Sequence, residues 1–183
     1  MINKIKCLIK NGESISVEFK KCEYDLPKNI FETVCAFLNR NGGEILLGVE
    51  DSGVIAGIEI SNLQKIKSNF VSAMNNPQKI SPTIYLSISE VELDGKSILY
   101  IYVPESSQVH NTNGKIYDSN EDGDFEVTNS TDTVALMYIR KQRDYTENTI
   151  SLCYYEWFKN RTYWQGSNNG YKQATASRMG EIN

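Results

Sequence analysis

The sequence lacks the patterns that mark membrane and secreted proteins. Its 183 residues contain no apolar run of about 18 residues, the length that a membrane-spanning helix needs. The opening MINKIKCLIK is interrupted by lysines and lacks the continuous apolar segment of a secretory signal. We therefore expect a cytoplasmic protein with no membrane partner.

Metal-binding patterns of cysteine and histidine are also missing. The four cysteines, Cys7, Cys22, Cys35 and Cys153, form no C-x-x-C pair, and His110 is the only histidine. A zinc site is therefore not expected, and a chain of this length without an export signal does not need disulfides. We expect reduced thiols that are mostly buried, and a histidine with a structural role.

The sequence has no phosphate-binding loop. Residues 39–43 (NRNGG) are rich in glycine but match neither G-x-x-x-x-G-K-S/T nor G-x-G-x-x-G. Their glycines follow a predicted helix, whereas phosphate loops place glycines at a helix N-terminus, where free N–H groups attract anions. The segment is therefore interpreted as a helix stop, and ATP binding is not expected.

The chain does have the composition of a folded globular domain. Apolar residues make up 40% and charged residues 23%, which argues against disorder along most of the chain. The net charge of −4 disfavours nucleic-acid binding, but the charge is unevenly distributed. Residues 1–40 hold seven Lys or Arg and five Asp or Glu, residues 44–133 hold five and fourteen, and 140–161 are basic again. A local basic face is therefore compatible with phosphate binding.

Hydrophobic periodicity predicts an α+β domain. Strands are expected at 4–9, 14–20, 44–49, 54–60, 83–93, 97–103 and 133–140, with a further short strand at 115–117. Helices are expected from Pro27 to Leu38, with Asp25 as the N-cap, and over 62–75. Asp94-Gly95 predicts a tight hairpin turn. The expected sheet is mixed and mostly antiparallel, with two main helices.

The C-terminal part of the chain differs from the rest. We expect residues 1–145 to form one domain and residues 146–183 to form a helix, at about 147–160, followed by a polar tail. Aromatic residues are concentrated in that helix, between Tyr154 and Phe158. If they are exposed, they would favour a protein-interaction or scaffold domain, because exposed aromatic side chains can pack against a partner.

Three carboxylates are candidates for a shared catalytic and metal site. Glu18 lies on the polar face of the second predicted strand, Glu13 just before that strand, and Asp51 directly after a predicted buried strand. Oxygen-rich sites of this kind suit Mg²⁺ or Mn²⁺, ions that polarise a phosphodiester and activate water. Lys20 shares the strand face of Glu18 and could contact a phosphate or stabilise developing charge. The alternative is ordinary surface charge.

Basic and aromatic residues are the candidates for contacts to nucleic acid. They are Lys20, Lys21, Arg40, Tyr138, Arg140, Lys141 and Arg143. At 138–143, arginine and lysine are interleaved with a tyrosine at the end of a predicted strand, so that the patch could hold a phosphate backbone while the tyrosine stacks on a base. The alternative is a solvated strand exit.

The order of these motifs resembles the Schlafen AlbA-like domain, in its bacterial branch. The resemblance rests on Glu13-x4-Glu18-Phe19-Lys20, AFLN at 36–39, NGGEILLGVEDSG at 41–53 and Ile55-x-Gly57-Ile58. It is strongest over 12–59, and VPES at 103–106 and YIR at 138–140 extend it to most of 1–145. Such sequences have also been labelled divergent AAA ATPases, a label that the missing phosphate loop disfavours here.

This resemblance implies a nucleic-acid-binding domain of the kind often labelled DNA-binding or transcriptional regulator. In the Schlafen nucleases of eukaryotes, two glutamates and an aspartate form the RNA-cleaving site, and the matching positions are Glu13, Glu18 and Asp51, with Lys20 as the matching lysine. Glu50 is the alternative to Asp51. Those nucleases join two related lobes into a cradle. The single lobe expected here implies either a homodimer with nuclease activity or a domain that only binds DNA or RNA.

Overall fold

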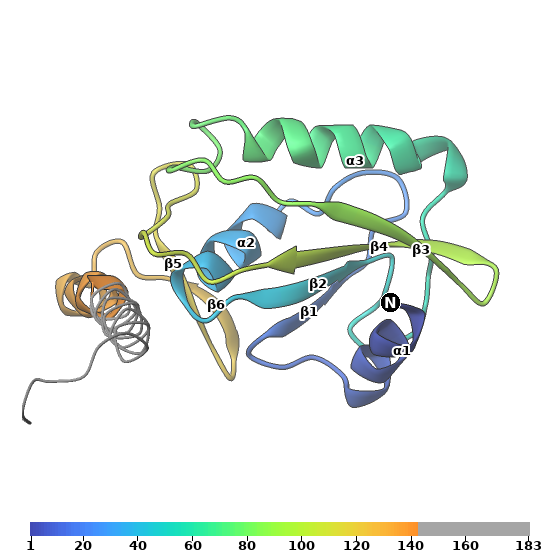
Figure 1. The fold of residues 1–183 in the computed structure, drawn as a ribbon, viewed down its shortest axis with the longest axis horizontal. Coiled ribbons are helices and arrows are strands. Elements are labelled where there is room, and N and C mark those ends of the chain that lie inside the picture. The colour runs from blue at the N-terminus through green and yellow to red at the C-terminus, as the bar shows by residue number, and fades with distance from the viewer. Residues whose placement is uncertain (143–183) are drawn as a thin grey trace, which may run out of the picture. The chain divides into compact units, whose positions relative to one another are not determined.

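The computed structural model describes residues 1–142, all of which lie in one compact unit. The elements are α1 (Ile2–Asn11), β1 (Val17–Lys20), α2 (Ile30–Asn39), β2 (Gly43–Leu47), α3 (Ile60–Met74), β3 (Ile88–Leu93), β4 (Lys96–Val103), β5 (Tyr117–Asn120) and β6 (Gly123–Glu126), followed by a helix at 131–142 (Figure 1). The predicted α+β class is confirmed. The helix predicted at 147–160 lies outside the described residues, as do Arg143 and Cys153.

The main sheet is mixed, as predicted. Its four strands lie in the order β1-β2-β4-β3, with β1 parallel to β2 and the other two pairings antiparallel. The apolar β2 is therefore an inner strand. Asp94 and Gly95 connect β3 to β4 with positive φ angles of 52° and 74°, which is the backbone that a two-residue hairpin turn requires. Strands β5 and β6 form a separate two-stranded sheet.

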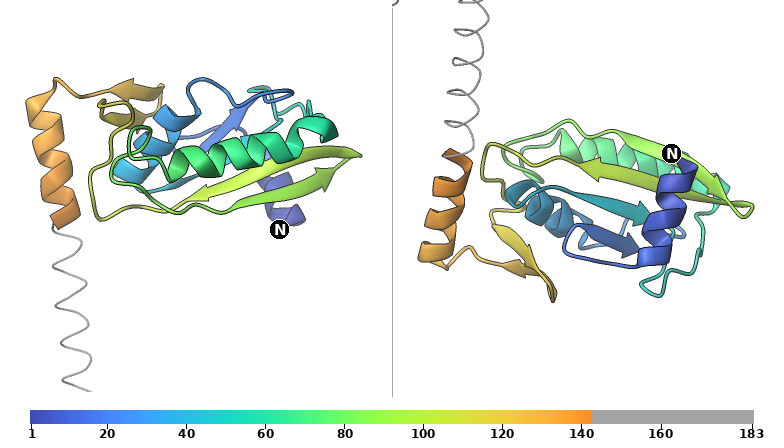
Figure 2. Two further views of the ribbon diagram at one scale, coloured as in Figure 1. Left: turned by 90° about the horizontal axis from the view of Figure 1, so that it is seen from above. Right: turned by 60° about the horizontal axis from the view of Figure 1, so that its bottom comes forward.

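Helices cover both faces of the main sheet (Figure 2). The larger core lies between the sheet and α2 and α3, and includes Phe37, Leu47, Phe70 and Ile101. The smaller core lies on the opposite face beneath α1, and includes Ile5, Phe19, Leu46 and Ile98. Because successive strand residues face opposite sides of a sheet, neighbouring apolar residues in β2 and β4 are divided between the two cores. No helix of the described part of the chain is long and apolar enough to cross a bilayer.

Two of the predicted strands are helices. Residues 4–9 belong to α1, where Ile5 is buried and Leu8 and Ile9 pack beside it, a helical spacing. Residues 133–140 belong to the helix at 131–142, which buries Met137. Both segments are short, and in such segments a helical and an alternating pattern are hard to distinguish. Packing against the sheet and against α2 decides in favour of the helix.

Two smaller predictions were also wrong. Residues 54–60 form no strand and make only an isolated bridge between Val49 and Ile55, because Gly57 turns with a φ of 85° against Lys96 and α3 begins at Ile60. The N-cap of α2 is Asn29 and not Asp25, so the helix begins three residues after Pro27.

The two adjacent glycines end α2 and allow close packing, which confirms the helix stop. Gly42 has a φ of +76°, and a Cβ atom there would lie 2.6 Å from the carbonyl oxygen of Val103. A Cβ atom on Gly43 would lie 2.4 Å from the Phe37 ring. Only glycine therefore allows α2 to turn directly into β2 while β4 lies alongside.

Candidate nucleic-acid interface

Several candidate site residues gather where the parallel strands β1 and β2 end. Lys20, the last residue of β1, lies opposite Leu47, the last residue of β2. The segments that follow these strands carry Lys21 and Asp51, and they leave the sheet at the same edge. Lys21 Nζ lies 3.3 Å from Glu50 Oε1, so the two segments are in direct contact. We call this region the β1–β2 edge.

Glu13 occupies the open side of β1. The carbonyl groups of Ser16 and Lys20 bond to β2, so the intervening Phe19 N–H faces away from it, and it donates to Glu13 Oε1 at 2.8 Å. Burial raises the pKa of Glu13, the Phe19 N–H lowers it, and the charges of Glu18 and Asp51 raise it further. Glu13 therefore accepts a structural hydrogen bond, and its pKa also depends on the charges of the other two predicted carboxylates.

Glu18 and Lys20 form an ion pair on the face of β1 opposite to Phe19, with both side chains partly buried. The hairpin of β5 and β6 brings Asp124 near them. Burial raises the pKa of Asp124, the neighbouring Thr33 side chain lowers it, and the charge of Glu18 raises it again. This fourth carboxylate is not among the predicted site residues, because it lies on a hairpin that is distant from them in the sequence.

The predicted carboxylates do not form a ready set of metal ligands. Within residues 1–142, no three His, Cys, Asp or Glu side chains lie close enough together to hold a metal ion. One oxygen of Glu13 accepts the Phe19 N–H, and one oxygen of Glu18 is engaged by Lys20. As arranged, these residues therefore do not fit a Mg²⁺ or Mn²⁺ ion held by three carboxylates.

The described cysteines are all free. Cys22 and Cys35 are buried, and burial raises the pKa of their thiols to about 11 and about 12. Cys7 is exposed on α1. The two buried thiols are therefore uncharged at neutral pH, in agreement with the expectation of reduced, mostly buried thiols.

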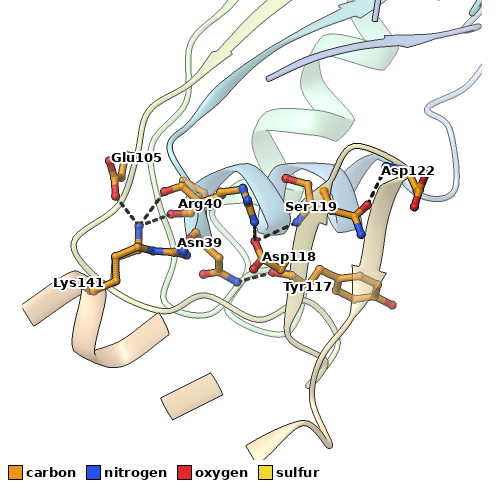
Figure 3. Close-up of polar contacts among 11 residues, drawn as sticks. Asn39, Arg40, Glu105, Tyr117, Asp118, Ser119, Asp122 and Lys141 are labelled. Atoms are coloured by element: carbon orange, nitrogen blue, oxygen red, sulfur yellow. Dashed lines mark hydrogen bonds and ion pairs between the residues drawn. The ribbon is translucent and has the colours of Figure 1, made fainter. Parts of the chain in front are cut away.

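Lys141, predicted to contact phosphate, instead binds the C-terminal end of α2 (Figure 3). Its side chain is only 3% exposed, and Nζ donates to the carbonyl oxygens of Leu38 at 3.3 Å and Arg40 at 3.0 Å. The same atom lies 2.9 Å from Glu105 Oε1. A cation at this position stabilises carbonyl groups that have no partner within the helix and complements the helix dipole. Lys141 therefore fastens the helix at 131–142 to α2.

The remaining basic candidates divide between this end of α2 and the surface. Arg140 donates to the carbonyl oxygen of Asn39 at 2.7 Å. Arg40 pairs with the buried Asp118 at 3.3 Å (Figure 3). Tyr138 lies on the helix at 131–142 with half of its surface exposed. We call the region around Arg40, Arg140 and Lys141 the α2 end.

Asn39 joins the α2 end to the loop at 110 and to β5. It is fully buried, its Oδ1 accepts the His110 N–H at 2.7 Å, and its Nδ2 donates to the carbonyl oxygens of His110 and Tyr117, both at 2.9 Å. The His110 ring has a similar role. Nδ1 must carry the proton, since it bonds to the Pro82 carbonyl at 2.8 Å, and Nε2 then accepts from the Ser106 hydroxyl at 2.7 Å. The structural role expected for His110 is confirmed.

Comparison with known families agrees with this fold. The family model described as Schlafen, AlbA_2 matches residues 13–137, which is most of the chain. This chain belongs to the Schlafen AlbA_2 family. The match begins at Glu13 and includes the whole β1–β2 edge.

Two solved structures resemble this AlbA_2 domain. One is the N-terminal domain of a protein from Nitrosomonas europaea described as related to the ATP-dependent DNA helicase RecG; it is 26% identical, with a TM-score of 0.43, and the match covers 57% of this chain and 70% of that one. The other is the DIP2311 protein from Corynebacterium diphtheriae, 18% identical with a TM-score of 0.50, where the match covers 69% of this chain and 29% of that one. The second likeness concerns the fold alone.

Proposed function

We propose that this AlbA_2 domain binds nucleic acid at the β1–β2 edge. The observation that supports the proposal is the pair Lys20 and Lys21 at the end of β1, on an edge that the family match includes. The Lys21 side chain is 58% exposed and pairs with Glu23 at 2.9 Å and Glu50 at 3.3 Å. Exposed ion pairs contribute little to stability, so Lys21 can exchange these carboxylates for a phosphate at small cost.

Fluorescence anisotropy with labelled single-stranded RNA, single-stranded DNA and duplex DNA tests this proposal. Binding should weaken steeply as salt rises, because each phosphate contact releases counterions. Lys21→Gln should weaken all three complexes and lower the slope of log affinity against log salt by about one. Lys65→Gln is the matched control. Lys65 lies on α3, its side chain is 57% exposed, and it pairs with Asp25 at 2.7 Å. Absence of binding, or equal effects of the two substitutions, would reject the proposal.

A metal-dependent endoribonuclease is the second candidate function, and it rests on the family resemblance at Glu13, Glu18 and Asp51. The charges of the other two act on Glu13, but a metal would require the three side chains to rearrange. The test of this function is incubation with tRNA and with single-stranded DNA, with and without Mn²⁺. Glu18→Gln should abolish any Mn²⁺-dependent cleavage, whereas Glu121→Gln, which alters an exposed residue of the β5–β6 turn, should not. Equal cleavage by wild type and Glu18→Gln would remove this function.

Two finer aspects rest on the family resemblance. A transcriptional-regulator role requires that duplex DNA is preferred to RNA and that one DNA sequence competes better than others, which the anisotropy experiment measures through unlabelled competitors. A homodimer would supply the second lobe of a cradle, and light scattering with and without nucleic acid measures the mass. A monomer in both states would exclude that arrangement.

A further inference from the structure

The sheet face that carries α1 is covered by this helix at one end only. Helix α1 packs over Leu93 and Ile98, close to the turn between β3 and β4 (Figure 2, right). Toward the other end of β4, Tyr100 belongs to the α1 core, whereas Ile101 belongs to the core on the opposite face. The alternation along the strand therefore puts Tyr102 on the α1 face, beyond the helix, where it is 54% exposed.

A second exposed tyrosine lies in the segment that leads into β3. Ile84, Leu86 and Ile88 of this segment pack into the core on the α2 and α3 side. The residue between the first two, Tyr85, therefore points away from that core, and it is 78% exposed. Two largely exposed tyrosines thus lie on β4 and on the segment that leads into its neighbour β3.

The helix beside these tyrosines is basic. Helix α1 carries Lys4, Lys6 and Lys10 and no acidic residue, and all three lysines are exposed. Lys4 Nζ lies 5.3 Å from the centroid of the Tyr100 ring and 5.9 Å from that of Tyr102. This arrangement holds a cation beside the exposed ring, in the range of a cation–π contact.

One carboxylate, that of Glu44, also contributes its negative charge to this face. Glu44 Oε2 lies 3.0 Å from Lys4 Nζ, and Lys4 also donates to Tyr100 Oη at 3.0 Å. The tyrosine hydroxyl and the carboxylate raise the pKa of Lys4, so its ammonium group stays charged at neutral pH. Lys4 therefore balances the charge of Glu44 on this face, and its side chain is 52% exposed.

We propose that this tyrosine face, formed by Tyr85 and Tyr102 with Lys4, binds single-stranded nucleic acid. The inference rests on the proposed nucleic-acid binding, but it concerns a different surface from the β1–β2 edge. Bases stack on the exposed tyrosine rings, and Lys4 exchanges Glu44 for a neighbouring phosphate. A duplex offers no free base faces along its length, so the chemistry selects single strands.

The test measures binding of the full chain to a dT12 strand, to an abasic strand of the same length and to duplex DNA. Tyr102→Ser should weaken binding to dT12 by about tenfold, the size expected for one lost stacking contact, and should leave the abasic strand and the duplex unchanged. Tyr102→Phe keeps the ring and should bind dT12 like wild type. Unfolding in urea checks that the exposed substitution leaves the fold intact.

The outcomes separate this inference from the function on which it rests. If wild type binds none of the three ligands, nucleic-acid binding itself is rejected, and the tyrosine face with it. If Lys21→Gln binds more weakly than wild type but Tyr102→Ser does not, the β1–β2 edge is supported and the tyrosine face is rejected. If Tyr102→Ser weakens dT12 and the abasic strand equally, no base stacks on Tyr102, and the inference also fails.

Discussion

The β1–β2 edge and the α2 end both contain closely spaced charged residues, yet their cations have different roles. At the β1–β2 edge, Lys20 and Lys21 pair with side-chain carboxylates near the surface. At the α2 end, Arg140 and Lys141 bind main-chain carbonyl groups, and Lys141 is almost completely buried. A side-chain partner on the surface can be exchanged for a ligand, whereas a helix end cannot lose its cation without leaving carbonyl groups unpaired.

The comparison shows that the sequence spacing of basic residues does not identify a binding surface. The segment 138–143 has the stronger basic pattern, with three cations in four residues. The two of these that the structure describes contact α2. Availability for a phosphate therefore depends on whether the cation can leave its present partner, and this favours the β1–β2 edge.

The largest expected effect tests the α2 end through Asn39. Asn39→Ala should lower the free energy of unfolding by about 3 kcal/mol, because it leaves the main-chain groups of His110 and the Tyr117 carbonyl without their partner. Urea denaturation measures this change. Asn41→Ala, at an exposed position two residues away, should change it by less than about 0.5 kcal/mol. Similar values for the two variants would contradict the structural role of Asn39.

A somewhat smaller effect compares one lysine from each region. Lys141→Met keeps much of the side-chain volume but removes the cation at the end of α2, and we expect a loss of about 2 kcal/mol in the free energy of unfolding. Lys21→Gln should leave the unfolding curve almost unchanged while it lowers the salt dependence of nucleic-acid binding. If Lys141→Met were as stable as wild type, the division between structural and available cations would be wrong.

A third prediction separates the two roles of Glu13. Glu13→Ala should lower the free energy of unfolding by about 1 kcal/mol, because the Phe19 N–H at the sheet edge loses its acceptor. Glu13→Gln keeps an oxygen there and should unfold like wild type, although the charge is gone. Any Mn²⁺-dependent cleavage should nevertheless be lost in Glu13→Gln. A Gln variant as unstable as the Ala variant would show that the charge itself holds the edge.

The smallest effect is a pH dependence at the α2 end. Burial lowers the pKa of His110, the Pro82 carbonyl raises it, and the charge of Lys141 lowers it. The folded protein therefore binds this proton more weakly than the unfolded chain does. The contribution to stability is complete above the ordinary histidine pKa of about 6.5, and it is lost as the pH falls from there toward the lower folded value.

Urea denaturation of wild type and His110→Gln between neutral and mildly acidic pH measures this contribution. Wild type should lose stability on acidification with a slope below about 1.4 kcal/mol per pH unit, the limit for one proton, and the variant should show a flatter slope. The raised pKa values of Glu13 and Asp124 act in the opposite direction and are common to both proteins. Parallel curves would contradict the burial of a neutral imidazole.

Much of the fold was predictable, because several signals in the sequence are local. The turn at Asp94-Gly95 and the stop at Gly42 require positive φ angles, which a few residue types adopt readily. The long amphipathic pattern of α3 and the apolar run of β2 identified their elements correctly. The short segments 4–9 and 133–140 carried no such signal, and their conformation depends on what they pack against.

In the candidate site, the sequence could indicate proximity only for residues that belong to the neighbouring strands β1 and β2 or adjoin them. Glu13, Glu18 and Asp51 belong to or adjoin β1 and β2, and the charges of the other two do act on Glu13. Asp124 joins them from a hairpin that is distant in the sequence, and no local pattern indicates that contact. Metal binding by the three predicted carboxylates stays a prediction, as does their role in catalysis.

By itself, the sequence determined the α+β class, the inner strand β2, the glycine stop and the resemblance to the AlbA-like family, because each depends on local backbone requirements or on motif order. Only the tertiary structure decided which charges are available. The burial of Lys141, the contact of Glu13 with Phe19 and the exposure of Tyr102 beside Lys4 each depend on segments that folding brings together. The energy of a charged or aromatic group depends on its surroundings, and these exist only in the folded chain.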